Sequence, residues 1–289
     1  MSAAFRRLEP GDQLCVWGGD YLEDVDVPLN GGTAEAGIVV RAAPGERPVL
    51  HGLLRLHKPD FWTVRGLNVT WRRGLRPRDH LVKVVGGAHW QFVEAEVWNA
   101  RSFAAVLVAG APVRFRLANL HVHDTHRANG TNQDHLVYLN CGTGGGVVED
   151  CLLVGSLNGR AVKVGPEEPG GAAVANIVLR YNTMVDNTGP SNVQLAWDTS
   201  NVVVERNIMV HAARDRANVT SFSLTGRANV VRDNIGWRSA GVLEEATAGL
   251  ADGGGNFSFD PRLRPSARLR PPNAALVPRN VTAARYGAG

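Results

Sequence analysis

A short pattern that recurs between residues 146 and 210 constrains the fold of this chain more than any other feature. Three copies stand in the sequence: GVVEDCLLV (146–154), IVLRYNTMV (177–185) and VVVERNIMV (202–210). In each copy an apolar run leads to a polar corner and then to a second apolar run that ends in Val. The corner residues Cys151, Asn182 and Asn207 stand 31 and 25 residues apart. This period is too short for a domain and too long for a hairpin, so it predicts a solenoid.

The apolar runs predict strands, because they are short and rich in Val and Ile. The pattern continues outward, with further corners at Gly66, Ala95, Asn119 and Asn234. A second strand precedes each repeat, at 81–85, 105–109, 136–140, 161–165, 192–196 and 221–225. We therefore expect an all-β, single-stranded parallel β-helix of about seven coils, with three short strands per coil.

Asparagine occupies four of the expected corners, at 119, 182, 207 and 234. A buried Asn offers two donors and an acceptor, so stacked Asn side chains can bond one another and the unpaired corner backbone. The sequence therefore predicts an asparagine ladder along the axis. The alternative is that Asn simply favours turns, which explains single cases but not a shared register.

The whole chain, 1–289, is expected to form one domain. Residues 1–50 are expected to cap the open end of the coil, 51–239 to form its body, and 240–289 to form an irregular C-terminal tail. The opening residues (8–27 and 37–52), the repeats such as NVVVERNIMV and the exit segment 259–277 resemble the right-handed parallel β-helix proteins of the pectate-lyase-like superfamily. The resemblance covers nearly all of the chain and is specific for fold.

The resemblance is poorly specific for chemistry, because this superfamily includes lyases, hydrolases, esterases, epimerases and binding proteins. It implies that an extended polysaccharide lies in a groove along one sheet and that the protein acts outside the cell. The N-terminal residues have no apolar core of signal-peptide length, so the sequence leaves the localisation open. No apolar run approaches 18 residues, so no membrane span is expected. The protein is expected to be a monomer.

Alternation along the second set of strands places one polar strip on the outside of the coil. Val and Leu point inward, and the residues between them point outward: Lys83, Leu107, Tyr138, Lys163, Gln194 and Ser223. The same alternation places Phe222 and Leu224 inward. Outward residues on consecutive coils stand about 4.8 Å apart. Tyr138, Lys163 and Gln194 are thus expected to form the middle of a ligand-binding face, with Lys83 at its edge. The alternative is a solvated sheet face without a role.

Two long loops are expected to flank this strip. Residues 71–80 hold four arginines, and residues 123–135 hold His123, Asp124, Arg127, Asp134 and His135. Asp186 follows at the equivalent place of a later coil. His123, Asp124, Arg127, Gln194, Asp186 and Lys83 are the predicted substrate-binding residues. Lys163, Tyr138, His135 and Asp134 are the predicted catalytic residues.

No cofactor is assigned, although a Ca²⁺ site of Asp124, Asp134 and loop carbonyls stays open as an alternative. His121 and His123 alternate on one strand, but His121 aligns with Leu153, Met184 and Met209. That alignment favours packing over metal binding, so no metal ligand is assigned. The net charge of +4 says little about partners. The arginine-rich loops lack the interleaved aromatic residues of nucleic-acid stacking platforms, so no nucleic acid is expected.

An enzyme that cleaves an acidic polysaccharide by β-elimination is the favoured function. That reaction needs a cation for the uronate carboxylate, a base for the C5 proton and an acid for the leaving oxygen. Lys163 is the candidate base if nearby positive charge lowers its pKa. Tyr138 or His135 is the candidate acid, and Arg127 or an arginine of 72–78 the candidate carboxylate ligand. Two alternatives stay open: a non-catalytic glycan-binding β-helix, and a glycosidase using two of Asp124, Asp134, Asp186 and Asp198.

Overall fold

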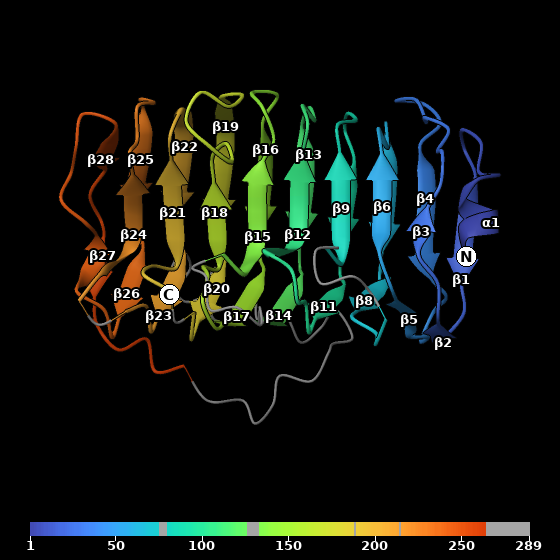
Figure 1. Cartoon of the computed structure of the whole chain (residues 1–289), viewed down its shortest axis with the longest axis horizontal. Helices are drawn as coiled ribbons and strands as arrows, with labels where there is room; N and C mark the ends of the chain where they lie inside the picture. Colours follow the sequence, from blue (N-terminus) through green and yellow to red (C-terminus); the bar gives the residue numbers. More distant parts are fainter. Residues whose placement is uncertain (75–79, 126–132, 188, 214, 264–289) are drawn as a thin grey trace.

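The computed structural model describes residues 1–74, 80–125, 133–187, 189–213 and 215–263 and contains three all-parallel sheets (Figure 1). We call them sheets A, B and C. Sheet A contains β1 (Gln13–Val16), β4 (Ile38–Ala42), β7 (Trp62–Arg65), β10 (Gln91–Val93), β13 (Phe115–Ala118), β16 (Gly146–Glu149), β19 (Val174–Arg180), β22 (Thr199–Glu205), β25 (Asn229–Arg232) and β28 (Leu250–Asp252).

Sheet B contains β2 (Gly19–Tyr21), β5 (Pro48–His51), β8 (Asn68–Thr70), β11 (Glu96–Trp98), β14 (His121–Thr125), β17 (Leu152–Ser156), β20 (Thr183–Val185), β23 (Ile208–Val210), β26 (Ile235–Trp237) and β29 (Phe257–Ser258). Sheet C contains β3 (Val25–Asp26), β6 (Leu54–His57), β9 (Val82–Val85), β12 (Ala104–Ala109), β15 (His135–Asn140), β18 (Val162–Val164), β21 (Val193–Ala196), β24 (Ala217–Phe222) and β27 (Gly241–Leu243).

The chain visits the three sheets in turn, and every strand pairs in parallel with its counterpart one coil further on. This is the predicted parallel β-helix, and its crossovers have the right-handed sense that parallel connections take. The coils stack along one long axis from α1 to β28 (Figure 1). Within the described ranges, no helix is long and apolar enough to cross a membrane.

The stack is longer than the repeats indicated, with ten strands in sheets A and B where about seven coils were expected. Residues 1–50 were expected as N-terminal cap coils with short strands, and residues 13–51 form β1 to β5, which pair in register with the following coils. The helix α1 (Ser2–Phe5) lies at the end of the stack, where Phe5 is fully buried with its ring 5.8 Å from that of Trp62.

The interior follows the alternation in the sequence. The inward residues predicted for β9, β12, β15, β18 and β21 have no exposed surface: Val82, Val84, Val106, Val108, Val137, Leu139, Val162, Val164, Val193 and Leu195. β24 differs, because its register pairs Thr220 with Gln194 and Ser221 with Leu195. Phe222, predicted inward, is 51% exposed and packs edge-on against Trp197. Ser223 lies beyond the strand and is not part of the outward strip.

Between sheets A and B the chain turns through one residue with positive φ, at Gly66, Glu94, Asn119 and Asp150 in successive coils. The next residue occupies a buried position that repeats along the axis, and we call this set the corner column. Strand register places in it Leu67, Ala95, Leu120, Cys151, Asn182, Asn207 and Asn234. Gly66 and Asn119 were therefore the wrong residues for this column, each one position too early in the sequence: they are the turning residues, and Leu67 and Leu120 fill the column.

Asparagine side chains bond one another in the C-terminal half of the corner column. Asn182 Nδ2 donates to Asn207 Oδ1 at 3.0 Å, and Asn207 Nδ2 donates to Asn234 Oδ1 at 3.0 Å. The same oxygens accept from the backbone, with Asn182 N–H 2.9 Å from Asn207 Oδ1. Cys151 begins this series, since its backbone N–H donates to Asn182 Oδ1 at 3.0 Å. The first half of the column is apolar and the second half is a hydrogen-bonded stack.

Candidate functional site on the outer face of sheet C

Adjacent strands of sheet C bring the predicted polar strip together. Leu107 pairs with Lys83 and with Tyr138, Tyr138 pairs with Lys163, and Lys163 pairs with Gln194. Each lies between two inward-facing residues of its own strand, so all five point away from the core. Thr220 follows Gln194 on the next coil.

These side chains point outward, yet most are covered. Tyr138 is 2% exposed, Lys163 6% and Gln194 8%, while Lys83 is half-buried. Tyr138 packs with Ala104 and Leu107, and the Phe103 ring meets its ring at 6.1 Å and 70°. The sequence predicted an outward-facing polar strip that lines a ligand-binding groove; these side chains do face outward, but the face is a largely buried patch with polar groups in it.

Lys163 lies on the Tyr138 ring. Its Nζ stands 4.6 Å from the ring centroid, a cation–π contact between neighbouring coils. Burial lowers the pKa of Lys163, and the positive charge of Arg160 lowers it further, while Glu167 opposes the shift. Burial also raises the pKa of Tyr138 above its ordinary value, with Glu167 adding to the effect. The amine is thus biased toward its neutral form and the phenol keeps its proton.

Arg160, which the sequence did not single out, belongs to this patch. It is 4% exposed, and burial lowers the pKa of its guanidinium to about 10. Arg160 precedes β18 by two residues and Lys163 by three, so the chain carries both cations to one place. The strand pattern could not reveal Arg160, because alternation predicts the inward or outward direction of a side chain only for residues inside strands. Its proximity in sequence to Lys163 was the available signal.

His135 lies beneath the patch and is fully buried. Its Nδ1 accepts a hydrogen bond from the backbone N–H of Arg160 at 3.2 Å, which places the proton of the neutral ring on Nε2. Burial, together with Arg160 and Lys163, lowers the pKa of His135 well below its usual value. The ring stands 5.8 Å from Tyr138. Among the described residues, neither His135 Nε2 nor the Tyr138 hydroxyl has a hydrogen-bond partner.

Asp134 is fully buried at the start of β15 and organises the backbone there. Its carbonyl accepts from Thr125 Oγ1 at 2.8 Å and from Ser156 Oγ at 2.7 Å. Its carboxylate Oδ1 accepts from the Asn158 N–H at 2.8 Å. These contacts give Asp134 a structural task at the chain's entry into sheet C.

The other predicted substrate ligands are not gathered at this patch. His123 lies in β14 of sheet B and bonds Asp124, with 2.7 Å between Nδ1 and Oδ2. Asp186 lies at an exposed corner after β20, where its Oδ1 is 2.5 Å from His211 Nδ1. Arg127 lies outside the described residues.

The carboxylates proposed for a glycosidase are dispersed. Asp134 precedes a strand of sheet C and Asp198 follows one, whereas Asp124 lies within β14 of sheet B and Asp186 follows β20 of the same sheet. Among the described residues the one group of His, Cys, Asp and Glu side chains close enough to share an ion is Glu96, His121 and His123. The two imidazoles of this group do not suit Ca²⁺, which prefers oxygen ligands. The Ca²⁺ site expected at Asp124 and Asp134 involves other residues and stays a prediction.

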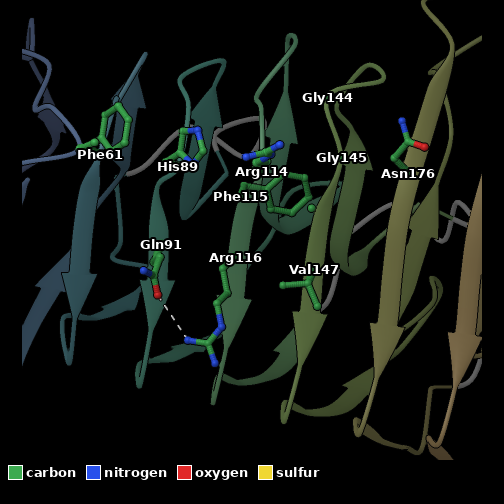
Figure 2. A pocket seen from close by; sticks show the side chains of 12 residues that line it. Phe61, His89, Gln91, Arg114, Phe115, Arg116, Gly144, Gly145, Val147 and Asn176 are labelled. Atoms are coloured by element: carbon green, nitrogen blue, oxygen red, sulfur yellow. Dashed lines mark hydrogen bonds between the residues drawn. The ribbon is translucent and has the colours of Figure 1, made fainter.

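A shallow hollow of about 740 Å³ lies on the outer face of sheet A (Figure 2). Phe61 and His89 stack at one end with ring centroids 4.8 Å apart. Arg116 lies beside Gln91 in this view, and its Nε donates to Glu149 at 2.7 Å. The residues that line the hollow include no Lys, Tyr, Asp or Glu, so it lacks the acid–base groups of the sheet C patch.

Solved structures of polysaccharide lyases have the same fold. The pectate lyase Pel9A aligns with a TM-score of 0.58 at 14% identity, over 90% of this chain and 72% of that one. An alginate lyase from Paenibacillus sp. str. FPU-7 aligns with a TM-score of 0.51 at 14% identity, over 90% of this chain and 94% of that one. The alginate lyase AlyF-OU02, solved with G6, aligns with a TM-score of 0.54 at 14% identity, over 88% and 59% of the two chains.

At these identities the likeness shows the fold alone, a right-handed parallel β-helix. No protein-family model matches the sequence, and no curated protein matches it.

Proposed function

We propose that this β-helix binds an acidic polysaccharide along the outer face of sheet C and cleaves it by β-elimination, with Lys163 as the base. The observation that carries the proposal is the buried group of Lys163, Arg160 and Tyr138. It combines an amine of lowered pKa, a second cation close enough to lower that pKa, and a protonated phenol in contact with the amine. The lyases that share the fold make a polysaccharide the best-supported ligand class.

The chemistry follows from these three groups. Neutral Lys163 removes the C5 proton of a uronate, the electron pair forms the C4–C5 double bond, and the C4–O4 bond breaks. A lowered lysine pKa increases the fraction of amine able to accept that proton at neutral pH. Arg160 is the carboxylate ligand, since a guanidinium can bind both oxygens and offset the charge that develops at C5.

Tyr138 is the better candidate for the acid that protonates the leaving oxygen. Its hydroxyl is protonated and lacks a partner among the described residues, as expected of a donor whose acceptor arrives with the ligand. His135 is less suited, because its lowered pKa leaves a neutral ring at neutral pH. We assign His135 the task of positioning Arg160 through its bond to the Arg160 backbone.

The test is incubation of the purified chain with polygalacturonate, polymannuronate and polyguluronate, followed by ultraviolet absorbance of the unsaturated uronate product. We expect product from at least one polymer, and Lys163→Ala should lower kcat by at least a hundredfold. Arg65→Ala, which removes a half-exposed cation from sheet A, is the matched control and should leave kcat unchanged.

A glycan-binding protein without activity is the second candidate, because the patch is largely buried and binding alone would satisfy its polar groups. In that case the polymers give no absorbance, but a retardation assay in polymer-containing gels detects binding that Lys163→Ala weakens. If none of the three polymers gives either product or binding, the proposed function is wrong.

A further inference from the structure

Three potential metal ligands meet on the outer face of sheet B, a different sheet from the proposed catalytic patch. Glu96 of β11 and His121 of β14 are directly paired neighbours on adjacent coils, and His123 lies two residues beyond His121 on the same face. Glu96 is 3% exposed and His121 5%, while His123 is partly open to solvent. Because His121 faces outward, the sequence alignment that favoured its packing in the core was wrong.

The distances suit one small cation. Glu96 Oε1 lies 2.9 Å from His123 Nε2 and 3.8 Å from His121 Nδ1, and the three ligand atoms lie within 4.8 Å of one another. A tetrahedral zinc ion with bonds of about 2.1 Å requires ligand atoms roughly 3.4 Å apart. Small side-chain rotations convert one arrangement into the other. The two imidazole rings stack with centroids 4.1 Å apart, and each has a nitrogen within 4 Å of Glu96 Oε1.

Two further residues hold the ligands in orientation. Asp124 Oδ2 accepts from His123 Nδ1 at 2.7 Å, which leaves Nε2 directed at Glu96. Arg47 donates to the other oxygen of Glu96, Oε2, at 2.5 Å and leaves Oε1 for the shared position. A carboxylate behind the remote nitrogen of a histidine is the usual outer shell of a metal-bound imidazole.

We propose that Glu96, His121 and His123 bind one divalent first-row transition metal ion, for which Zn²⁺ is the probe. Two imidazoles and a carboxylate are ligands that zinc accepts, and three protein ligands leave a fourth position for water. On binding, the ion takes the place of the Nε2 proton that His123 shares with Glu96 Oε1, and this proton passes to solvent. The ion links β11 to β14, two consecutive coils.

The proposal can be tested on the whole purified chain, stripped with a chelator and then titrated with Zn²⁺ by calorimetry. We expect one ion per chain and a higher melting temperature with Zn²⁺ than without. Replacement of Zn²⁺ by Co²⁺ should give the visible absorption of a tetrahedral site. Glu96→Gln, His121→Ala and His123→Ala should each weaken binding at least tenfold.

Two variants keep the test decisive even where a buried substitution prevents folding. Asp124→Ala alters an exposed outer partner and should weaken Zn²⁺ binding tenfold to a hundredfold while the chain stays folded. His211→Asn removes a histidine that is paired with Asp186 but is not part of such a cluster, and should leave binding unchanged. Absence of stoichiometric binding, or binding that Asp124→Ala and the ligand variants leave intact, would overturn the proposal.

Discussion

A single hydroxyl group, that of Tyr138, distinguishes the sheet C patch from an ordinary packed surface. It is buried without a hydrogen-bond partner among the described residues. Leaving such a group unsatisfied costs about 1–3 kcal/mol. The cost is understandable if the hydroxyl acts on a ligand.

Tyr138→Phe separates these two possibilities. Because the hydroxyl makes no bond within the described protein, its removal should leave the free energy of unfolding unchanged or raise it by about 1 kcal/mol. Denaturant unfolding measures this, and the uronate assay should show a large loss of kcat in the same variant. A destabilised Tyr138→Phe would mean that the hydroxyl has a partner in the free protein.

Near the same patch His80 provides a pH-dependent element. It is 5% exposed, and its Nδ1 lies 3.1 Å from the Ala104 carbonyl. Burial lowers the pKa of His80 from 6.5 to about 4; the bond to Ala104 opposes this shift, and the charges of Lys83 and Arg55 add to it. Between these values the unfolded chain binds the proton more readily, so stability rises with pH across this window and is lost on acidification.

We therefore expect His80 alone to lower the free energy of unfolding by about 3 kcal/mol between pH 7 and pH 4. His80→Asn keeps an N–H near the Ala104 carbonyl but does not titrate. The variant is expected to be less stable at pH 7, because it loses the ring packed on Phe103, and to show a shallower pH dependence. Urea unfolding at several pH values measures both slopes, and identical slopes would contradict the prediction.

The corner column shows how one structural position accepts two kinds of chemistry. Leu67, Ala95 and Leu120 fill it by packing, whereas Asn182, Asn207 and Asn234 fill it by bonding to one another and to the corner backbone. Leucine fits the space, so the energetic effect of a substitution depends on the neighbours above and below. An Asn between two Asn neighbours has more bonds to lose than one at the end of the series.

Asn207→Leu should accordingly destabilise more than Asn182→Leu. Asn207 bonds Asn182 on one side and Asn234 on the other, and its Nδ2 also donates to the Leu179 carbonyl. Each variant leaves buried corner groups without hydrogen bonds, which should lower the free energy of unfolding by roughly 1–3 kcal/mol. Denaturant unfolding measures the two values. Equal losses, or none, would mean that the stack contributes little beyond packing.

The coils act as nearly independent layers, since each strand pairs only with its counterparts one coil away on either side. Stability in such a stack is approximately a sum over layers and their interfaces. Asn207 and Asn234 occupy the same position in consecutive coils, 27 residues apart. Deleting residues 207–233 therefore joins Arg206 to Asn234 with every strand in register.

We expect this deletion variant to fold, with an unchanged shape of its circular dichroism spectrum and a molecule shorter by about 4.8 Å in small-angle scattering. Deletion of residues 207–232 is the matched control. It shifts the register by one residue, so inward and outward side chains exchange faces, and it should aggregate. If both deletions behave alike, strand register is not what specifies the stacking.

The sequence by itself determined the fold and the residues of the central strip. Repeats of 25 and 31 residues with Val-rich strands admit few solutions other than stacked parallel coils, because an isolated coil cannot bury its own apolar side. Alternation with a period of two then placed Tyr138, Lys163 and Gln194 on one face, and the strand pairing confirms that they are neighbours there. These are local constraints, and a local pattern is sufficient to express them.

Only the tertiary structure decided the register of the corners and the surroundings of the strip. Asn119 was assigned to the corner column because Asn is as favourable at a left-handed turning residue as in a ladder, and this error of one residue placed His121 inside the coil. The burial of Lys163 against Tyr138 and the meeting of Glu96 with two histidines depend on contacts between coils. Such contacts join residues more than twenty positions apart, which no local period records.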